Sequence, residues 1–74
     1  MNLHPKECQA AVARLAPRQR EVLKLLAEGH PRKIIADKLD IAIGTVGVHC
    51  EGIYARLGVS SVAQAVVVFS KAGF

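Results

Sequence analysis

The sequence predicts an all-α fold, a small four-helix bundle with a helix-turn-helix, preceded by a short N-terminal helix or arm. Apolar residues recur three and four positions apart in successive segments, which is the spacing of amphipathic helices. Prolines and glycines stand where such helices start and end. Most apolar residues are Ala and Val, and only 4% of the residues are aromatic, so the core requires close helix–helix approach. With 74 residues, the chain is one small domain at most.

Residues 1–14 are predicted to form a leader that contains a short helix. Pro5 suits the first turn of a helix, where its missing N–H costs nothing. Apolar side chains then follow at helical spacing, namely Cys8, Ala11, Val12 and Leu15. The domain itself is expected to span residues 15–74.

A second helix is predicted to start at Pro17 and to end at Gly29. Pro17 fits the first helical position, and Gly29 fits the left-handed position that follows a last turn. The apolar stripe of this helix consists of Leu15, Val22, Leu23 and Leu26.

Residues 32–39, 40–42 and 43–57 are predicted to form a helix, a tight turn and a second helix. Ile41 is apolar within the turn, which indicates that it plugs the angle between the two helices. Gly58 fits the left-handed cap of the second helix. The apolar positions that mark the two helices are Ile34, Ile35, Ala36 and Leu39, followed by Val46, Cys50, Ile53 and Leu57.

A last helix is predicted over residues 62–72, with Ser60 or Ser61 as its N-cap. The run of three valines has some β-propensity, but the surrounding Ala and Gln residues favour a helix. The core stripe is expected to consist of Val62, Ala65, Val66 and Phe69. Val67 and Val68 cannot all face inward with that stripe, so exposed apolar residues here favour a dimer or a partner domain.

Several classes of protein are excluded by the composition. No stretch of about 18 apolar residues is present and the N-terminus lacks a signal core, so no membrane segment is expected. Cys8 and Cys50 are far apart and form no disulfide framework, which favours a reduced, cytoplasmic protein. His4, His30 and His49 do not have metal-ligand spacing, and neither a catalytic set nor a phosphate loop is present. We therefore expect no enzyme, no metal and no cofactor.

A helix-turn-helix places its second helix in the major groove of DNA. The net charge of +4 permits such a polyanionic partner. Between Ile43 and Leu57, however, the only full charges are Glu51 and Arg56, which sum to zero. Bidentate recognition of guanine by Lys or Arg is therefore not available from this helix. A nonspecific, electrostatic affinity for phosphates would then come from the flanking segments. Their basic residues are Arg14, Arg18, Arg20, Lys24, Arg32, Lys33 and Lys38, of which Arg18, Arg20 and Lys24 fit a simple solvated face equally well.

Five blocks of the sequence together resemble a known DNA-binding family. They read L-x-P-R-x-R-E-V-L at 15–23, L-A-E-G at 26–29, K-x-I-A-x-x-L-x-I at 33–41, G-T-V-x-V-H-x-x-x-I-Y-x-x-L-G-V at 44–59 and Q-A-V at 64–66. The pattern is similar to the DNA-binding domains of the LuxR/FixJ/NarL type and covers residues 15–69. The resemblance implies a four-helix bundle that presents a helix-turn-helix and serves as the effector of a transcription regulator.

The resemblance also implies roles for individual residues. Thr45 matches a hydroxyl that binds a phosphate near the start of the recognition helix. Val48 matches an apolar position that faces the groove, and His49 matches a His that contacts the DNA backbone. Lys33 and Arg56 match basic positions that reach phosphates, and Lys38 adds a further basic side chain beside them.

The chain departs from the family pattern at several of these positions. The family usually has Lys where this chain has Gly47, so Gly47 is part of the expected contact surface without its usual charge. Gly47 and Gly52 each destabilise a helix interior by about 1 kcal/mol relative to Ala. Glu51 either accepts a hydrogen bond from cytosine N4 or is a simple surface charge. Further departures are Ala42, Ile43 and Cys50, and the capping box before the second helix reads Ala16-Pro17-Arg18-Gln19, without its hydroxyl.

We predict sequence-specific binding to double-stranded DNA by a transcription regulator. The resemblance implies a homodimer through the last helix, for which the candidate interface residues are Val62, Val66, Val67 and Ser70. It also implies an N-terminal receiver or sensor domain in a longer chain, and RNA polymerase as a further partner. The alternative is a degenerate helix-turn-helix that serves as a dimerisation or protein-interaction module, a reading motivated by the neutral, Gly-rich helix with its apolar Ile43.

Overall fold

The computed structural model describes residues 4–74, and residues 1–3 of the predicted leader lie outside the described residues. Every regular element in this range is an α-helix, which confirms the all-α prediction. The helices are α1 (Pro5–Ala13), α2 (Pro17–Ala27), α3 (Arg32–Leu39), α4 (Ile43–Leu57) and α5 (Val62–Ala72).

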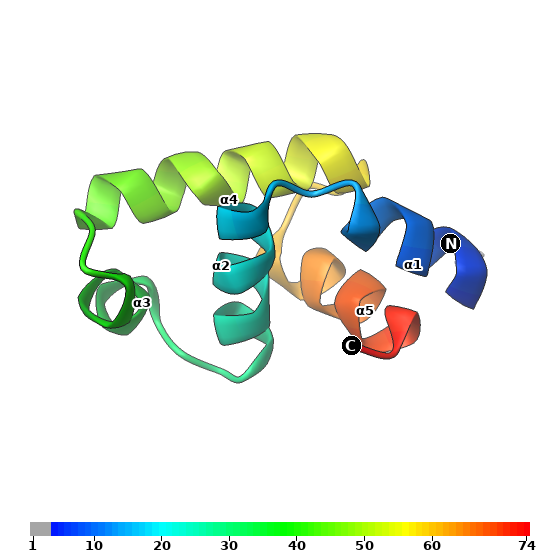
Figure 1. The fold of residues 1–74 in the computed structure, drawn as a ribbon, viewed down its shortest axis with the longest axis horizontal. Helices are drawn as coiled ribbons and strands as arrows, with labels where there is room; N and C mark the ends of the chain where they lie inside the picture. The colour runs from blue at the N-terminus through cyan, green and yellow to red at the C-terminus, as the bar shows by residue number, and fades with distance from the viewer. Residues whose placement is uncertain (1–3) are drawn as a thin grey trace.

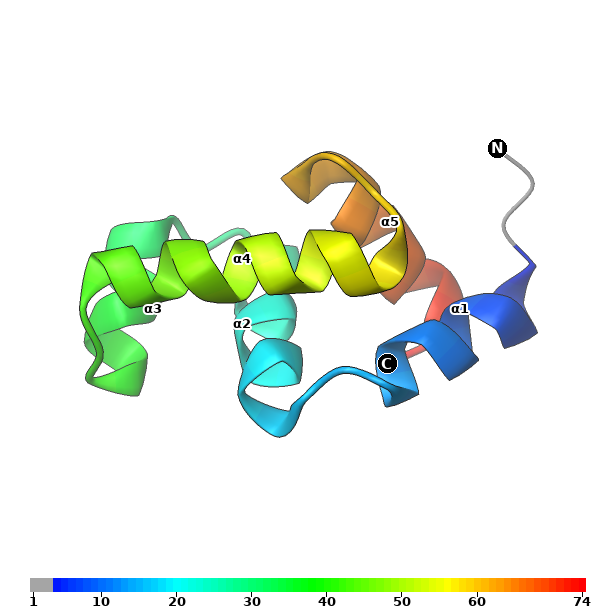
Figure 2. The ribbon, with the colours of Figure 1, turned by 90° about the horizontal axis from the view of Figure 1, so that it is seen from above.

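The longest helix, α4, runs along the long axis of the molecule, with α3 at one end and α1 at the other (Figure 1). Helices α2 and α5 lie on one side of α4, and within residues 4–74 no helix covers its opposite side (Figures 1 and 2). Helix α3 packs on the first part of α4, whereas α1 packs mainly on α5. The arrangement therefore leaves one side of α4 open to solvent along the molecule.

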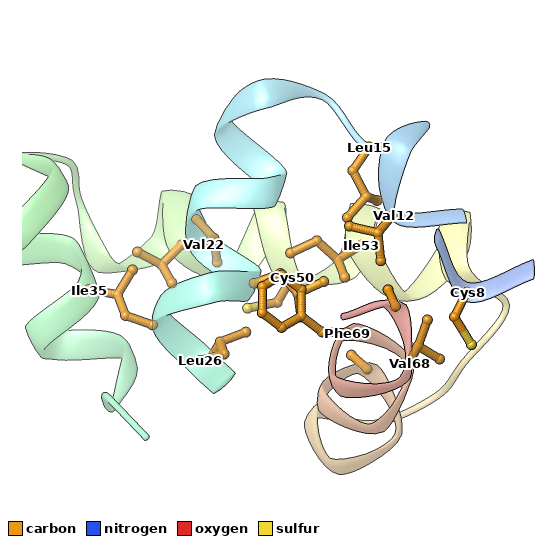
Figure 3. Close-up of a cluster of buried hydrophobic side chains, with 14 of the residues drawn as sticks. Cys8, Val12, Leu15, Val22, Leu26, Ile35, Cys50, Ile53, Val68 and Phe69 are labelled. Atoms are coloured by element: carbon orange, nitrogen blue, oxygen red, sulfur yellow. The ribbon is translucent and has the colours of Figure 1, made fainter. Parts of the chain in front are cut away.

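All five helices contribute to the core, α3 through Ile35 and Ala36 (Figure 3). It is built almost entirely from aliphatic side chains and two cysteines, with Phe69 as its aromatic member. Because Cys8 and Val12 of α1 are buried in it, the N-terminal helix shares the core of the bundle. The boundary between a leader of residues 1–14 and a domain of residues 15–74 stays a prediction. The buried residues are Cys8, Val12, Leu15, Val22, Leu23, Leu26, Ile35, Ala36, Val46, Cys50, Ile53, Ala65, Val68, Phe69 and Ala72.

The predicted helix ends agree with the structure. Pro5 and Pro17 occupy the first positions of α1 and α2. Gly58 ends α4 with a φ of 70°, and the Val59 N–H donates to the Tyr54 carbonyl over 3.0 Å, as in a left-handed helix cap. Of the two candidate serines, Ser61 caps α5, since its hydroxyl accepts from the Gln64 N–H over 3.2 Å. These local signals set the ends of the helices.

The predicted core face of α5 was partly wrong. Ala65 and Phe69 are buried as expected, but Val62 and Val66 are only half-buried, and Val68 is buried in their place together with Ala72. The buried face is rotated because α1 packs on α5 and covers a side that the sequence pattern alone left free. Val67 remains exposed, as expected from its position beside that face.

The start of α2 keeps half of a capping box. Ala16 has no side-chain acceptor, but the Gln19 side-chain oxygen accepts from the Ala16 N–H over 3.0 Å. The Gln19 amide lies against Gly52 of α4, where an added Cβ would come within 2.5 Å of Nε2. Gly52 is therefore not only a weak helix former, as the sequence suggested. It makes room for the side chain that caps α2.

The two interior glycines of α4 are expected to respond differently to alanine. Gly47→Ala places its Cβ 3.6 Å from the Arg32 side chain, an ordinary contact, so it should raise the free energy of unfolding by about 1 kcal/mol. Gly52→Ala displaces the Gln19 cap and should give no such gain. Urea unfolding of both variants tests this, with Gly52→Ala in a Gln19→Ala background as the control in which the gain should return. Equal stabilisation by both single substitutions would contradict the role of Gly52.

Candidate nucleic-acid interface

Helices α3 and α4 form the predicted helix-turn-helix, with the same bounds as expected from the sequence. Asp40 adopts the left-handed conformation, with a φ of 55°, and ends α3. The next N–H, that of Ile41, donates to the Ala36 carbonyl over 3.0 Å, which closes the turn. The Ile41 side chain is partly buried and packs against the core. Ile41 therefore points inward from the turn, as expected, while its place in the angle between the two helices stays a prediction.

Helix α4 has a buried face and an open face. Val46, Cys50 and Ile53 are buried, and Figure 3 shows Cys50 and Ile53 within the core cluster. On the open side, Val48 is 65% exposed and Ile43 is 56% exposed. A helix with one face held by the core and the other uncovered can enter a major groove, which is wide enough for a single α-helix.

The predicted contact residues fall into two groups by exposure. Gly47 and His49 are half-buried at the flanks of the open face of α4. The others are all exposed, on α3 or α4, namely Lys33, Lys38, Thr45, Val48, Glu51 and Arg56. The helix-turn-helix therefore presents every one of these side chains on α3 or α4, although their contacts with DNA stay predictions.

Arg56 has a structural partner within the chain. Its Nη1 donates to the Arg14 carbonyl over 3.1 Å and so joins the last turn of α4 to the end of α1. Arg56 lies at the end of α4 away from α3 (Figure 1). It therefore does not supply positive charge to the first turns of α4.

The sequence places Arg32 among the basic residues of the flanking segments, without a specific position beside α4. Arg32 is exposed and forms the first position of α3, and its Nη1 lies 3.6 Å from where a Cβ on Gly47 would stand. The guanidinium group thus lies over the glycine of α4. The sequence gives only an indirect indication of this contact. The family's usual Lys is absent at position 47, and Arg32 supplies a cation on the preceding helix.

This geometry agrees with the comparison with known families. The model described as "Bacterial regulatory proteins, luxR family" matches residues 13–69, which is most of the chain. The chain belongs to the luxR family.

Relatives within the luxR family are considerably longer than this chain. It is 43% identical over 56 residues to the nitrate/nitrite response regulator protein NarL of Escherichia coli K12, covering 76% of this chain and 26% of that protein. The putative HTH-type transcriptional regulator YhjB of the same organism is also 43% identical over 56 residues, with 76% and 28% covered. The putative HTH-type transcriptional regulator Rv0890c of Mycobacterium tuberculosis H37Rv is 40% identical over 52 residues, with 70% and 6% covered. No solved structure gives a significant match.

Helix α5 of this luxR-family chain carries the predicted dimer residues. Val62 and Val66 are half-buried, Val67 is 44% exposed and Ser70 is exposed. Val62 and Val66 are one helical turn apart and so lie on the same side of α5. An apolar strip along α5 is thus accessible at the surface, while the dimer itself stays a prediction.

A hollow of about 450 Å³ lies between α1, α2 and α5 and contains no residue of α3 or α4; it is lined by Val12, Pro17, Arg20, Glu21, Lys24, Phe69 and Phe74. Within residues 4–74, no group of three or more His, Cys, Asp or Glu side chains is placed to hold a metal ion. No single helix in this range is long and apolar enough to cross a membrane; α4 and α5 reach that length only as a pair, bent by 61°.

Proposed function

We propose that this luxR-family chain binds double-stranded DNA by placing α4 in the major groove. The observation that carries the proposal is the open face of α4, held in place by the core on its other side and flanked by the basic residues of α3. In this position the helix-turn-helix would act as the DNA-binding part of a transcription regulator.

We expect α3 and α4 to contact different parts of the DNA, because their charges differ. Most affinity for DNA comes from phosphate contacts, which the exposed Lys33 and Lys38 of α3 can make. On α4, Thr45 and His49 are proposed to bind the DNA backbone. Val48 is proposed to touch a thymine methyl group, and Glu51 can accept from cytosine N4. Sequence preference would then rest on apolar and acidic contacts rather than on Arg or Lys.

The oligomer and the wider protein are further parts of the proposal. The chain spans about a quarter of the length of the NarL and YhjB proteins. We therefore propose that it acts in the cytoplasm as the effector of a longer regulator, whose N-terminal receiver or sensor part controls it, with RNA polymerase as a further partner. A homodimer through α5 would place two copies of α4 on half-sites about one helical turn apart.

The salt dependence of binding tests the proposal. If two subunits each neutralise about four phosphates, the logarithm of the binding constant should fall with the logarithm of salt concentration with a slope near −7. Fluorescence anisotropy with a labelled mixed-sequence duplex measures this slope, and a library of random duplexes then identifies the preferred site. No binding at low salt, or a flat salt response, would sink the DNA proposal.

The same measurement discriminates the alternative function. The sum of formal charges along α4 is zero, and Ile43 and Val48 are exposed on its open face. These properties would also suit a helix-turn-helix that binds protein. In that case the chain would self-associate or bind a protein partner but would show no salt-dependent affinity for the duplex.

A further inference from the structure

The first turns of α4 carry no positive charge of their own. The charged residues between Ile43 and Leu57 are Glu51 and Arg56, and Arg56 is at the far end, bonded to the Arg14 carbonyl. A helix that enters the major groove has phosphates along both of its flanks. The part of α4 nearest α3 therefore needs its cation from another element.

Arg32 is placed where such a cation is needed. Its guanidinium Nη1 lies 3.6 Å from the Cβ position of Gly47, nearer than any other atom outside the neighbouring residues and the backbone of α4. A side chain at 47 that extends beyond Cβ would compete for this space, although an alanine would not. Gly47 is half-buried, between Val46 in the core and Val48 on the open face, so the guanidinium lies at the flank of that face, beside α3.

The position of Arg32 is not explained by helix stability or by a salt bridge. The first turn of α3 holds Arg32 and Lys33 and no acidic residue. Cations at a helix N-terminus are unfavourable, because they meet the positive end of the helix dipole. Among the described residues, Arg32 takes no part in the Arg18–Glu21 ion pair or in the contact between His30 and Glu28. A binding partner outside the chain, such as a DNA phosphate, would account for the position of this guanidinium.

We propose that Arg32 binds a DNA phosphate across Gly47, and so supplies from α3 the positive charge that α4 lacks. The inference rests on the proposed function, because it assumes that α4 lies in the groove. Gly47 acts in this arrangement as the space that lets the guanidinium lie close to α4. Arg32 is a contact to the DNA backbone, and it strengthens binding to all sequences alike.

The test compares Arg32→Ala with the unchanged 74-residue chain on a labelled mixed-sequence duplex. In the proposed dimer the substitution removes one phosphate contact from each subunit, so it should reduce the salt slope by about 1.8 and weaken binding about sixtyfold at about 0.1 M salt. Arg32→Lys keeps the charge and should bind nearly as well as the unchanged chain. Lys6→Ala is the charge-matched control, since Lys6 lies in α1 at the opposite end of the molecule from α3 (Figure 1). It should leave affinity and slope unchanged.

A second pair of variants tests the contact with Gly47. Gly47→Lys in the Arg32→Ala background returns a cation to α4 and should restore both the affinity and the slope. When Arg32 is present, the lysine of Gly47→Lys lies against the Arg32 guanidinium, so the single substitution should increase DNA affinity by less. Urea unfolding should show that Arg32→Ala is as stable as the unchanged chain or slightly more stable, because a cation leaves the start of α3.

The outcomes separate this inference from the proposed function. If the unchanged chain does not bind the duplex at low salt, the proposed function fails and this inference fails with it. If the unchanged chain binds but Arg32→Ala has the same affinity and slope, only the role of Arg32 is wrong. An equal loss in Lys6→Ala would also overturn it, because the effect would then be one of net charge and not of a contact beside α4.

Discussion

Replacing Ile53 with alanine is expected to lower the free energy of unfolding by about 2–5 kcal/mol. Ile53 is 0% exposed and points into the cluster that also holds Val12, Leu15 and Cys50 (Figure 3). The alanine would leave a cavity that the surrounding helices can fill only in part. A chain of this length has a total stability of about 4–11 kcal/mol, so the variant loses a large share of it. Thermal unfolding should show a midpoint at least about 8 °C lower.

The matched control lies on the same helix. Ile43→Ala makes the same chemical change at an exposed position on the first turn of α4. It should change the stability by less than about 0.5 kcal/mol. Similar losses of unfolding free energy in both variants would mean that the face of α4 with Ile53 does not pack against the core. The open face of α4 would then lie on the other side of the helix.

Val67→Glu is expected to separate the proposed dimer and to weaken binding to paired half-sites about a hundredfold or more. Val67 lies exposed beside the half-buried Val62 and Val66, so a carboxylate there would be desolvated in a dimer through α5. A second linked subunit raises affinity by roughly 10²–10⁴ through effective concentration alone, and this advantage disappears with the dimer. Sedimentation equilibrium measures the association, and anisotropy on the selected duplex measures the affinity.

Ala10→Glu provides the control for Val67→Glu, since it adds the same charge at an exposed position of α1. It should leave the association unchanged and lower the affinity for DNA only slightly. Association that survives Val67→Glu would place the dimer contact elsewhere and would remove Val62, Val66 and Ser70 as interface candidates as well.

Local signals were sufficient to predict the positions of the helices. The bounds of α3 and α4 agree with the structure because Asp40-Ile41-Ala42 and Gly58 interrupt the chain sharply. Pro17 and Ser61 mark the starts of α2 and α5 for the same reason, since each has its effect within one turn. The family pattern that the sequence shows over residues 15–69 is confirmed by the family model, which matches residues 13–69.

Contacts between helices could not be predicted in this way. The predicted buried face of α5 was partly wrong because it depends on how α1 packs against α5. The sequence of α5 alone does not indicate this packing. The sequence indicated only that Gly52 destabilises α4. The structure shows that it leaves space for the Gln19 amide, which lies against it. Arg32 was counted among flanking charges because nothing in a linear sequence joins position 32 to position 47. The least predictable part of the candidate site is therefore the part made by two helices together.

These two contacts have a consequence for attempts to change which DNA the chain prefers. Gly47 and Gly52 leave gaps in α4 that side chains of α3 and α2 fill. Helix α4 therefore cannot be replaced by the α4 of a relative without affecting its contacts with α2 and α3. A chimera that takes α4 from a relative with larger residues at 47 and 52 would displace Arg32 and Gln19, and would lose a cation and a helix cap in one step. Such a graft has to transfer positions 19 and 32 together with the helix.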